Sequence, residues 1–595
     1  MIEFISVFAL AIVLGWPLGR YLARGMRGAP MPGDRVFGWI ERPLYRLLGV
    51  DPRAGMDWKA YAIAFVGSNL VLGLLAWTVL MTQAWLPLNP NGAPNMRWDL
   101  ALHTMVSFLT NTNQQHYSGQ AQLSHLAQMT SIVGLQVVTP MMALALVVAT
   151  LRGLFGGRAD ANGQPCAAGD AGPLGVGHAD AGHADAGRID STDANARNID
   201  VGNYWADVIR PSVRVMLPLC LAWSLLLTAQ GVPSTLQGGP VAAPIDASAG
   251  MDAQKIPLGP VAAMVAAKQL GSNGGGWSGP NSTVPLENPT PLANLLETLA
   301  LILIPISVVF MLSAFTGRKR LSALVFGTMM AMSLVSVSAA LWSEGYSSTA
   351  TDVALMEGKE VRIGADASAL WAAMTTQINN GSVNMMLDSS APLTGLVAMS
   401  NMLVNAIWGG IGCGLQQFLV YLLLGVFLAG LMTGRTPELM GRKLETPQVR
   451  LLALLVLLQP ITLLTFTAIT LAVPGLSGTS NPGFHGISQV FYEYASAYAN
   501  NGSGFEGLGD NTAWWNLTCS LVLLLGRFPL LVVPLVIAAQ LAAKRRAPES
   551  PGTLQIETPT FALTLLSVIV ILTVLQFLPV LVLGPVADHL SLGLH

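Results

Sequence analysis

Long apolar stretches constrain this 595-residue chain more than any other feature of its sequence. Leu451–Val473, Leu521–Leu541 and Phe561–Leu583 each reach the length that a helix needs to cross a hydrocarbon core of roughly 30 Å. Hydrophobic residues make up 52% of the chain and charged residues only 10%, a balance too apolar for a soluble surface. The sequence therefore predicts an all-α polytopic membrane protein.

Basic residues gather in clusters that are separated by pairs of apolar spans, as the positive-inside rule requires. The clusters are Arg20–Arg27, Arg152–Arg158 with Arg210 and Arg214, Arg318–Arg320, Arg435–Arg450, and Lys544–Arg546. The apolar run Phe4–Leu18 has its basic residues after it and no evident cleavage site, which favours a retained first helix over a signal peptide. About ten transmembrane helices are expected, with both termini outside, near 3–20, 60–80, 126–151, 212–230, 292–315, 321–342, 392–433 (broken), 449–473, 513–542 and 560–583.

Residues 158–200 are rich in Ala, Gly and Asp and include the tandem sequence GHADAGHADAG. Because a segment with so few apolar residues cannot form a core, we expect a disordered cytoplasmic insert. The alternative is weak metal binding by His178 and His183. The cysteines Cys166, Cys220, Cys413 and Cys519 are widely spaced, which argues against a structural metal or a disulfide framework.

A fourfold repeat emerges in the long outer segments. Each contains an amphipathic stretch, a short uncharged tract rich in Asn, Gly and hydroxyl residues, and then a new apolar span. The tracts are TNTNQQ at 110–115, GSNGGG at 271–276, NNGSVN at 379–384 and NNGSGF at 500–505.

The tracts all face the same side of the membrane, because each repeat contains one crossing out and one crossing back. Parallel units of this kind can surround a single axis, unlike the inverted repeats of many carriers. A ring of backbone carbonyls replaces the hydration shell of K+ without net charge, whereas divalent or anion filters use charged rings. The sequence favours a potassium filter; the alternative is that the four tracts are ordinary surface turns.

The motifs FLTNTNQQHYSG (108–119), GSNGGGWSGPNST (271–283), NNGSVNMMLDS (379–389), NNGSGFEGLGDNT (500–512) and GLMTGRTPELMGRK (430–443) resemble the KdpA family of the Kdp potassium-transporting ATPases. The resemblance covers essentially the whole chain except the insert. It implies four parallel M1–pore loop–M2 repeats around a pseudo-fourfold pore, with one extra helix at each end. The implied filter residues are Asn111, Thr112, Asn113, Gln115, Ser272, Asn273, Gly274, Asn380, Gly381, Ser382, Asn501, Gly502 and Ser503. Relatives often carry Thr at position 272 and Cys at position 380.

The resemblance also implies an assembly in the bacterial inner membrane, with both termini periplasmic. Its partners would be a P-type ATPase subunit (KdpB), a single-span subunit (KdpC) and a small peptide (KdpF), within the lipid bilayer and without nucleic acid. Potassium would pass through a tunnel to the ATPase subunit, which uses the ATP, and no organic cofactor is expected. The expected regions are 1–58 (first helix and loop), 59–157 (repeat 1), 158–200 (insert), 201–317 (repeat 2), 318–443 (repeat 3), 444–546 (repeat 4) and 547–595 (last helix).

The stretch 391–434 is about twice too long for one straight crossing and must bend. A glycine cluster, Gly409, Gly410, Gly412 and Gly414, lies near its middle, where a helix can open into a loop. We expect this loop to block the straight route inward, so that ions turn toward the partner. The alternative is a tight helix-packing seam.

Charged side chains supply further candidates. Arg527 lies within an apolar run, where a cation is costly and usually functional. It either sets the potential below the filter or pairs with a carbonyl or carboxylate between helices. Glu287, Asp388, Glu506 and Asp510 flank the tracts and either concentrate cations or are simply solvated.

Two other function classes stay open. The chain contains no DKTGT phosphorylation sequence and no GxxxxGK[ST] loop, so it is not expected to hydrolyse ATP alone. It could be a self-sufficient potassium transporter of the Trk/Ktr class, or an intramembrane hydrolase using His103, His116 or His125.

Overall fold

The computed structural model describes residues 2–156, 199–246, 248, 250–346, 356–546 and 554–592. The predicted insert at 158–200 lies outside these residues except for its last two positions. Cys166, His178 and His183 therefore lie outside the described part of the chain as well.

The described residues are mostly helical. The α-helices are α1 (Ile2–Met26), α2 (Asp34–Leu48), α3 (Trp58–Thr82), α4 (Trp98–Leu109), α5 (Gly119–Gln122), α6 (His125–Ala127), α7 (Gly134–Phe155), α9 (Tyr204–Pro211), α10 (Leu217–Ala229), α11 (Val261–Leu270), α12 (Pro291–Thr316), α13 (Lys319–Tyr346), α14 (Ala365–Ile378), α15 (Pro392–Val404), α16 (Cys413–Met432), α17 (Thr446–Ala472), α18 (Phe484–Ala499), α19 (Ala513–Ala542), α20 (Pro559–Leu581) and α21 (Ala587–Leu592). Two short antiparallel hairpins pair β1 (Val241–Ala242) with β2 (Gln254–Lys255) and β3 (Glu438–Leu439) with β4 (Arg442–Lys443).

Ten helical segments of the described chain are long and apolar enough to cross a membrane, which confirms the predicted number. They are Glu3–Met26, Trp58–Trp85, His125–Phe155, Tyr204–Ala229, Pro291–Thr316, Lys319–Tyr346, Cys413–Met432, Thr446–Ala472, Ala513–Ala542 and Pro559–Leu592. Three of them begin at a threonine whose hydroxyl accepts a backbone N–H of the first turn, at Thr290, Thr512 and Thr558. Such caps satisfy amides that would otherwise be unpaired at the membrane boundary.

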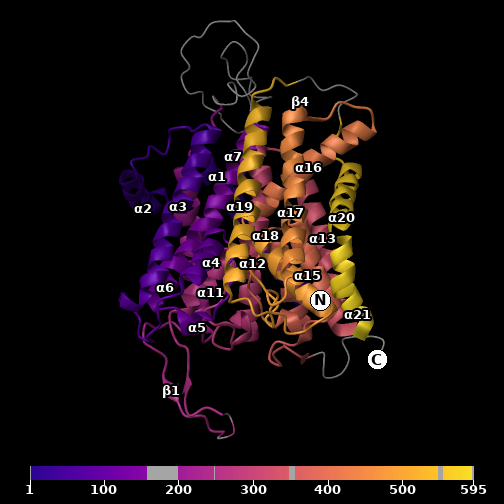
Figure 1. The fold of residues 1–595 in the computed structure, drawn as a ribbon. Coiled ribbons are helices and arrows are strands. Elements are labelled where there is room, and N and C mark those ends of the chain that lie inside the picture. Colours follow the sequence, from indigo (N-terminus) through magenta and orange to yellow (C-terminus); the bar gives the residue numbers. More distant parts are fainter. Residues whose placement is uncertain are drawn as a thin grey trace.

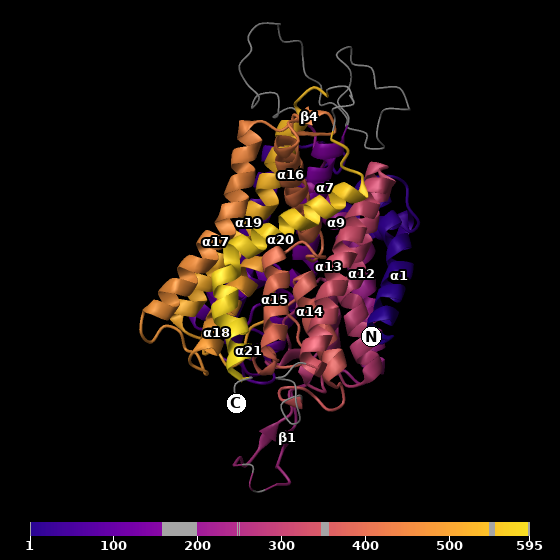
Figure 2. The same cartoon turned by 90° about the vertical axis from the view of Figure 1, so that its right-hand side faces the viewer.

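Four shorter helices, α4, α11, α14 and α18, lie in the half of the molecule that also holds the N-terminus and α21 (Figures 1 and 2). After each of them the chain turns and enters a longer helical segment directed toward the other end: α7, α12, α15 with α16, and α19, respectively. The four units therefore run in parallel, as the sequence predicts.

The segments that come after the first two tracts form the centre of the bundle. The spans containing α7 and α12 are mostly buried, whereas α3 and α17 expose apolar side chains along much of their length. Helix α1 covers α12 closely, because a β-carbon on Gly19 would lie 2.5 Å from the Ser307 carbonyl oxygen. Small residues allow such an approach between membrane helices.

Candidate functional site

The four tracts begin with the same backbone turn. The first residue with positive φ after each short helix is Asn111, Ser272, Asn379 or Asn500, with φ of 62°, 49°, 55° and 55°. This left-handed conformation ends a helix in many proteins and is tolerated best by Gly and Asn.

The residue after each left-handed position makes a second shared contact. Its N–H donates to the carbonyl five residues earlier: Thr112 to Ser107 (2.9 Å), Asn273 to Lys268 (3.2 Å), Asn380 to Thr375 (2.9 Å) and Asn501 to Ser496 (2.9 Å). This is the bond that closes a Schellman turn. It makes Thr112, Asn273, Asn380 and Asn501 structurally equivalent.

This equivalence refines the predicted set of filter residues. In the first two repeats the set begins at the left-handed residue, Asn111 or Ser272, but in the last two it begins one position later, at Asn380 or Asn501. Asn379 and Asn500 are the residues of the third and fourth tracts that correspond to Asn111 and Ser272. The sequence motif NNG conceals this register, because both asparagines of the pair suit the turn.

The tracts touch one another in a closed order. A β-carbon on Gly274 would lie 2.2 Å from the Gly381 nitrogen, and one on Gly381 would lie 2.8 Å from the Gly502 carbonyl carbon. A β-carbon on Gly502 would lie 2.0 Å from the Thr112 oxygen. The second tract therefore meets the third, the third meets the fourth, and the fourth returns to the first.

The first and second tracts are joined by side-chain amides. Asn273 Nδ2 donates to Asn111 Oδ1 at 2.9 Å. Gln115 Nε2 donates to the Gly276 oxygen at 3.1 Å, and the Gly276 N–H donates back to Gln115 Oε1 at 2.7 Å. These bonds complete the ring, so the predicted Gln115 ties two tracts together.

Several oxygens of the ring have no donor within the described residues. The carbonyl oxygens of Thr112, Asn113, Gly381 and Gly502 accept no hydrogen bond there. Of the side chains, Asn113 Oδ1, Ser272 Oγ and Asn273 Oδ1 are also without a partner in that part of the chain. Buried oxygens without donors are costly, and an unhydrated cation is a ligand that satisfies them.

The short helix of the second repeat carries a buried ion pair behind its tract. Lys268 Nζ lies 2.6 Å from Glu287 Oε2, and both side chains are fully buried. The same ammonium group donates to Ser282 Oγ at 2.8 Å. The expectation that Glu287 is simply solvated is therefore wrong: this carboxylate neutralises a lysine and helps to position the turn.

The other three acidic candidates lie at the outer rim. Asp388 Oδ1 accepts from His485 Nε2 at 2.9 Å, and the Asp388 N–H donates to Glu506 Oε2 at 3.0 Å. Asp510 Oδ2 lies 4.0 Å from His116 Nε2. Asp388 and Asp510 therefore face histidines, whereas Glu506 is exposed.

The predicted break in the third repeat separates α15 from α16. The loop contains Gly409, Gly410 and Gly412 with φ of 59°, 72° and 91°, a region that favours glycine. The Gly409 N–H donates to the Gln377 oxygen of α14 at 2.9 Å. A β-carbon on Gly410 would lie 3.7 Å from Ser272 Cβ, so the loop lies directly against the second tract.

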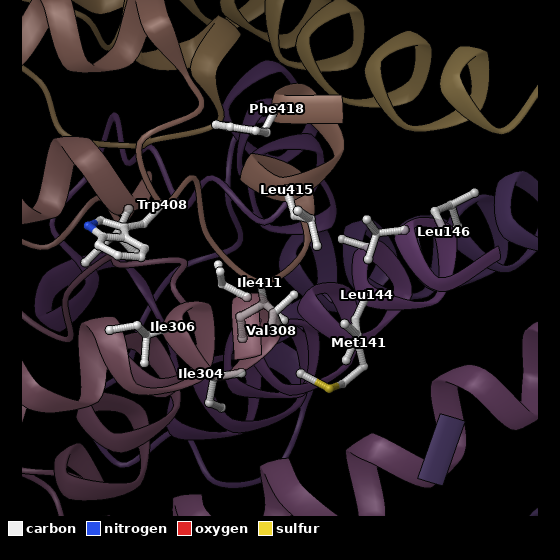
Figure 3. Close-up of a cluster of buried hydrophobic side chains, with 14 of the residues drawn as sticks. Met141, Leu144, Leu146, Ile304, Ile306, Val308, Trp408, Ile411, Leu415 and Phe418 are labelled. Carbon is white, nitrogen blue, oxygen red and sulfur yellow. The ribbon is translucent and has the colours of Figure 1, made fainter. Parts of the chain in front are cut away.

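The loop packs on a layer of apolar side chains from α7 and α12, which we call the apolar floor (Figure 3). Ile411 projects among the side chains of α7 and α12, including Leu144 and Val308. Gly414 closes against Gly409, its N–H donating to the Gly409 oxygen at 2.7 Å. This packing satisfies part of the non-helical backbone and makes the interior beneath the tracts apolar.

Arg527 on α19 reaches this region. Its guanidinium donates to Cys413 Sγ at 2.9 Å and to the Thr139 oxygen at 3.3 Å. Thr139 in turn donates from Oγ1 to Asn111 Oδ1 at 2.9 Å. No carboxylate of the described chain lies within ion-pair distance of Arg527. Its guanidinium therefore contacts the first residue of α16 directly and is separated from the first tract by one residue, Thr139.

The three histidines near the first tract do not come together as one group. His103 and His116 stack at 3.7 Å, whereas His125 contacts Trp277. In the part of the chain that the structure covers, none of the three imidazoles bonds to a hydroxyl or thiol. His116 instead lies 3.2 Å from Glu493 Oε1.

Tertiary structure brings one further group together that the sequence spacing does not reveal. Ligand atoms of His116, Glu493 and Cys519 lie within 4.8 Å of one another, all buried. Burial alone would lower the pKa of His116, but Asp510 and Glu493 raise it to about 9. The group has the ligand types of a transition-metal site, and a protonated His116 also balances its carboxylates.

Comparison with known proteins agrees with the motifs. Residues 5–590 match the family described as KdpA, potassium-transporting ATPase A subunit. A protein of Gloeobacter violaceus named potassium-transporting ATPase potassium-binding subunit is 42% identical over 99% of this chain and 98% of its own length. Proteins of the same name from Pseudomonas putida and Pseudomonas aeruginosa are 42% and 40% identical, with each alignment covering at least 98% of both chains.

Proposed function

Because the chain belongs to the KdpA family of potassium-transporting ATPases, we propose that it binds and translocates potassium for an ATP-driven uptake complex. In this proposal the chain is the non-catalytic, ion-binding component, and a P-type ATPase subunit hydrolyses the ATP. The single-span subunit KdpC and the small peptide KdpF would complete the assembly with KdpB.

The closed ring of four tracts is the observation that supports potassium binding. Its main-chain oxygens are uncharged and several have no donor, and its glycines lie where a side chain would overlap the neighbouring tract. Such a ring can replace the hydration of a monovalent cation, because carbonyl dipoles act at close range without net charge. Glycine at the seams keeps the four tracts close enough to share one ion.

The loop of the third repeat supports a sideways route. It lies against the second tract, rests on apolar side chains and is followed by Cys413, which Arg527 contacts. An apolar floor and a buried cation both disfavour an unhydrated K+ moving straight inward. We infer that potassium enters from the periplasm and leaves through a lateral tunnel to the ATPase subunit, in an inner-membrane arrangement with both termini periplasmic.

The test is the potassium-dependent ATPase activity of the co-purified complex with Gly274→Asp in this chain. The substitution places a charged side chain at a seam where even a β-carbon would lie 2.2 Å from Gly381 N. We expect the apparent potassium affinity to fall by at least about a hundredfold, equivalent to roughly 2.7 kcal/mol. The matched control is Gly475→Asp, since Gly475 also has positive φ (81°) but no atom within 4 Å of the added carbon.

Three outcomes would count against the proposal. Equal affinities for Gly274→Asp and Gly475→Asp would remove the filter assignment. Failure of the wild-type chain to co-purify with an ATPase subunit would remove the assembly. Rapid potassium flux through the chain alone in liposomes without ATP would favour a self-sufficient transporter of the Trk/Ktr class.

A further inference from the structure

Helix α2 lies outside the helix bundle, at the left edge of Figure 1. It has 15 residues, too few to cross a bilayer, and one side attaches it to the rest of the chain. Arg214 donates to both carboxylate oxygens of Glu41, at 2.5 and 2.8 Å, and also to Asp34. Tyr45 lies in the same buried cluster as Ala206.

The opposite side of α2 is apolar and exposed. Val36, Trp39 and Leu47 are 69%, 85% and 82% exposed, and Ile40 is 47% exposed. Spacings of three, four and seven residues place these side chains on one face of a helix. Water disfavours such a stripe, whereas the boundary between headgroups and acyl chains accommodates it, Trp in particular.

A third stripe of α2 is basic. Arg35, Arg42 and Arg46 are exposed, and Arg53 follows in the next loop. None of these four arginines forms an ion pair with an acidic side chain of the described residues. Arg214 engages Asp34 and Glu41, the two acidic residues of α2. The outer surface of the helix therefore carries uncompensated positive charge beside its apolar stripe.

The basic surface continues into a cavity of about 530 Å³ between the ends of several helices. Four arginines and two aspartates are among its lining residues: Arg27, Arg53, Arg152, Arg210, Asp200 and Asp207. Asp207 is engaged by Arg152, which leaves the remaining charge of the cavity positive. On the attached side of α2, the buried hydroxyl of Tyr45 has no hydrogen-bond partner in the described chain.

We infer that α2 and the adjoining arginines bind the headgroups of anionic phospholipids. The helix lies in the membrane interface, with its apolar stripe among the upper acyl segments and its arginines against lipid phosphates. An amphipathic helix with Arg and Trp on adjacent faces binds anionic membranes through both contributions. The inference rests on the chain spanning a membrane and is independent of the ion route.

The experiment uses the intact complex, purified in detergent and placed in nanodiscs of phosphatidylglycerol or phosphatidylcholine. The triple variant Arg35→Gln, Arg42→Gln, Arg46→Gln should retain at least about fivefold less co-purified phosphatidylglycerol by mass spectrometry. The matched control, Lys319→Gln, Arg320→Gln, Arg435→Gln, removes three exposed basic residues elsewhere and should retain as much as the wild type. A second variant, Trp39→Ser with Leu47→Ser, should weaken retention of both lipids.

Unchanged potassium-dependent ATPase activity in detergent establishes that each variant is folded, and that measurement reports on the ion site separately. Equal phosphatidylglycerol retention by the triple variant and its control overturns the inference. So does loss of a partner subunit from the triple variant without loss of lipid, which would make α2 a protein contact. Displacement of the bound lipid by inorganic phosphate alone would also overturn it, because the apolar stripe would then contribute nothing.

Discussion

The third repeat differs from the other three in the segment that comes after its tract. After the first, second and fourth tracts the chain continues into one long helical segment, whereas after the third it forms α15, a glycine-rich loop and then α16. The turn that begins each tract is nevertheless the same in all four repeats. The turn that begins each tract is therefore a shared element, suited to holding an ion. The glycine-rich loop between α15 and α16 is unique to the third repeat and is suited to directing the ion.

Breaking the shared element should have the largest effect. Gly502→Ala places a β-carbon 2.0 Å from the Thr112 oxygen at a residue with φ of 103°. Strain and overlap of this kind cost about 3 kcal/mol or more, so apparent potassium affinity should fall at least about a hundredfold in the ATPase assay. Gly483→Ala in the same repeat, with φ of 82° and open space around it, should leave the affinity unchanged. Similar affinities for the two variants would contradict a packed ring.

Breaking the unique element should affect coupling rather than affinity. Gly409→Ala puts a β-carbon 2.2 Å from Gly414 Cα at φ of 59°, a strain of about 2 kcal/mol that shifts a conformational balance about thirtyfold. Potassium transported per ATP in proteoliposomes should fall accordingly. Gly434→Ala, with φ of 66° and nothing within 4 Å, is the control. Normal stoichiometry in Gly409→Ala would favour a simple packing seam.

Arg527 sharpens the comparison, because it connects the loop side to the first tract. Arg527→Gln removes the charge and its bonds to Cys413 and Thr139, at a cost of about 1 kcal/mol. Passive potassium leak through the complex without ATP should rise about fivefold, while affinity changes little. Arg527→Lys retains the charge and should leak less than Arg527→Gln. If both variants leak equally, the arginine acts by packing and hydrogen bonding alone.

The smallest expected effect concerns the outer contact between the third and fourth repeats. His485 donates to Asp388 and lies 2.9 Å from Asp588 of α21, and these carboxylates raise the pKa of His485 to about 9. A raised folded-state pKa stabilises the fold fully below about pH 6.5 and loses that contribution as pH rises through about 9. The Tm should therefore fall by about 1–3 °C more in the wild type than in His485→Gln between pH 6.5 and 9.5. Parallel pH profiles would exclude this contact as a contributor.

The spans and repeats were predictable because length and hydropathy are local properties. The number of apolar segments and the break near Gly409 are confirmed, although Tyr204–Ala229 begins eight residues earlier and Pro559–Leu592 ends nine residues later than expected. The register of the tracts was not predictable, since Asn379 and Asn380 are identical in type and only the bond from Asn380 to Thr375 distinguishes them. The ion pair of Glu287 was not predictable either, because Glu287 lies in a turn whereas its buried partner Lys268 lies on α11, 19 residues earlier in the chain.

The sequence by itself determined that this chain crosses a membrane about ten times and repeats one turn four times, because apolar length and backbone conformational preference act over a few neighbouring residues. Only the tertiary structure decided that Gly502 closes on Thr112, that Arg527 reaches Cys413, and that His116, Glu493 and Cys519 meet. The residues that meet in each of these contacts lie far apart in the sequence. Their proximity depends on how whole helices pack, and packing depends on the summed shapes of many side chains rather than on any local pattern.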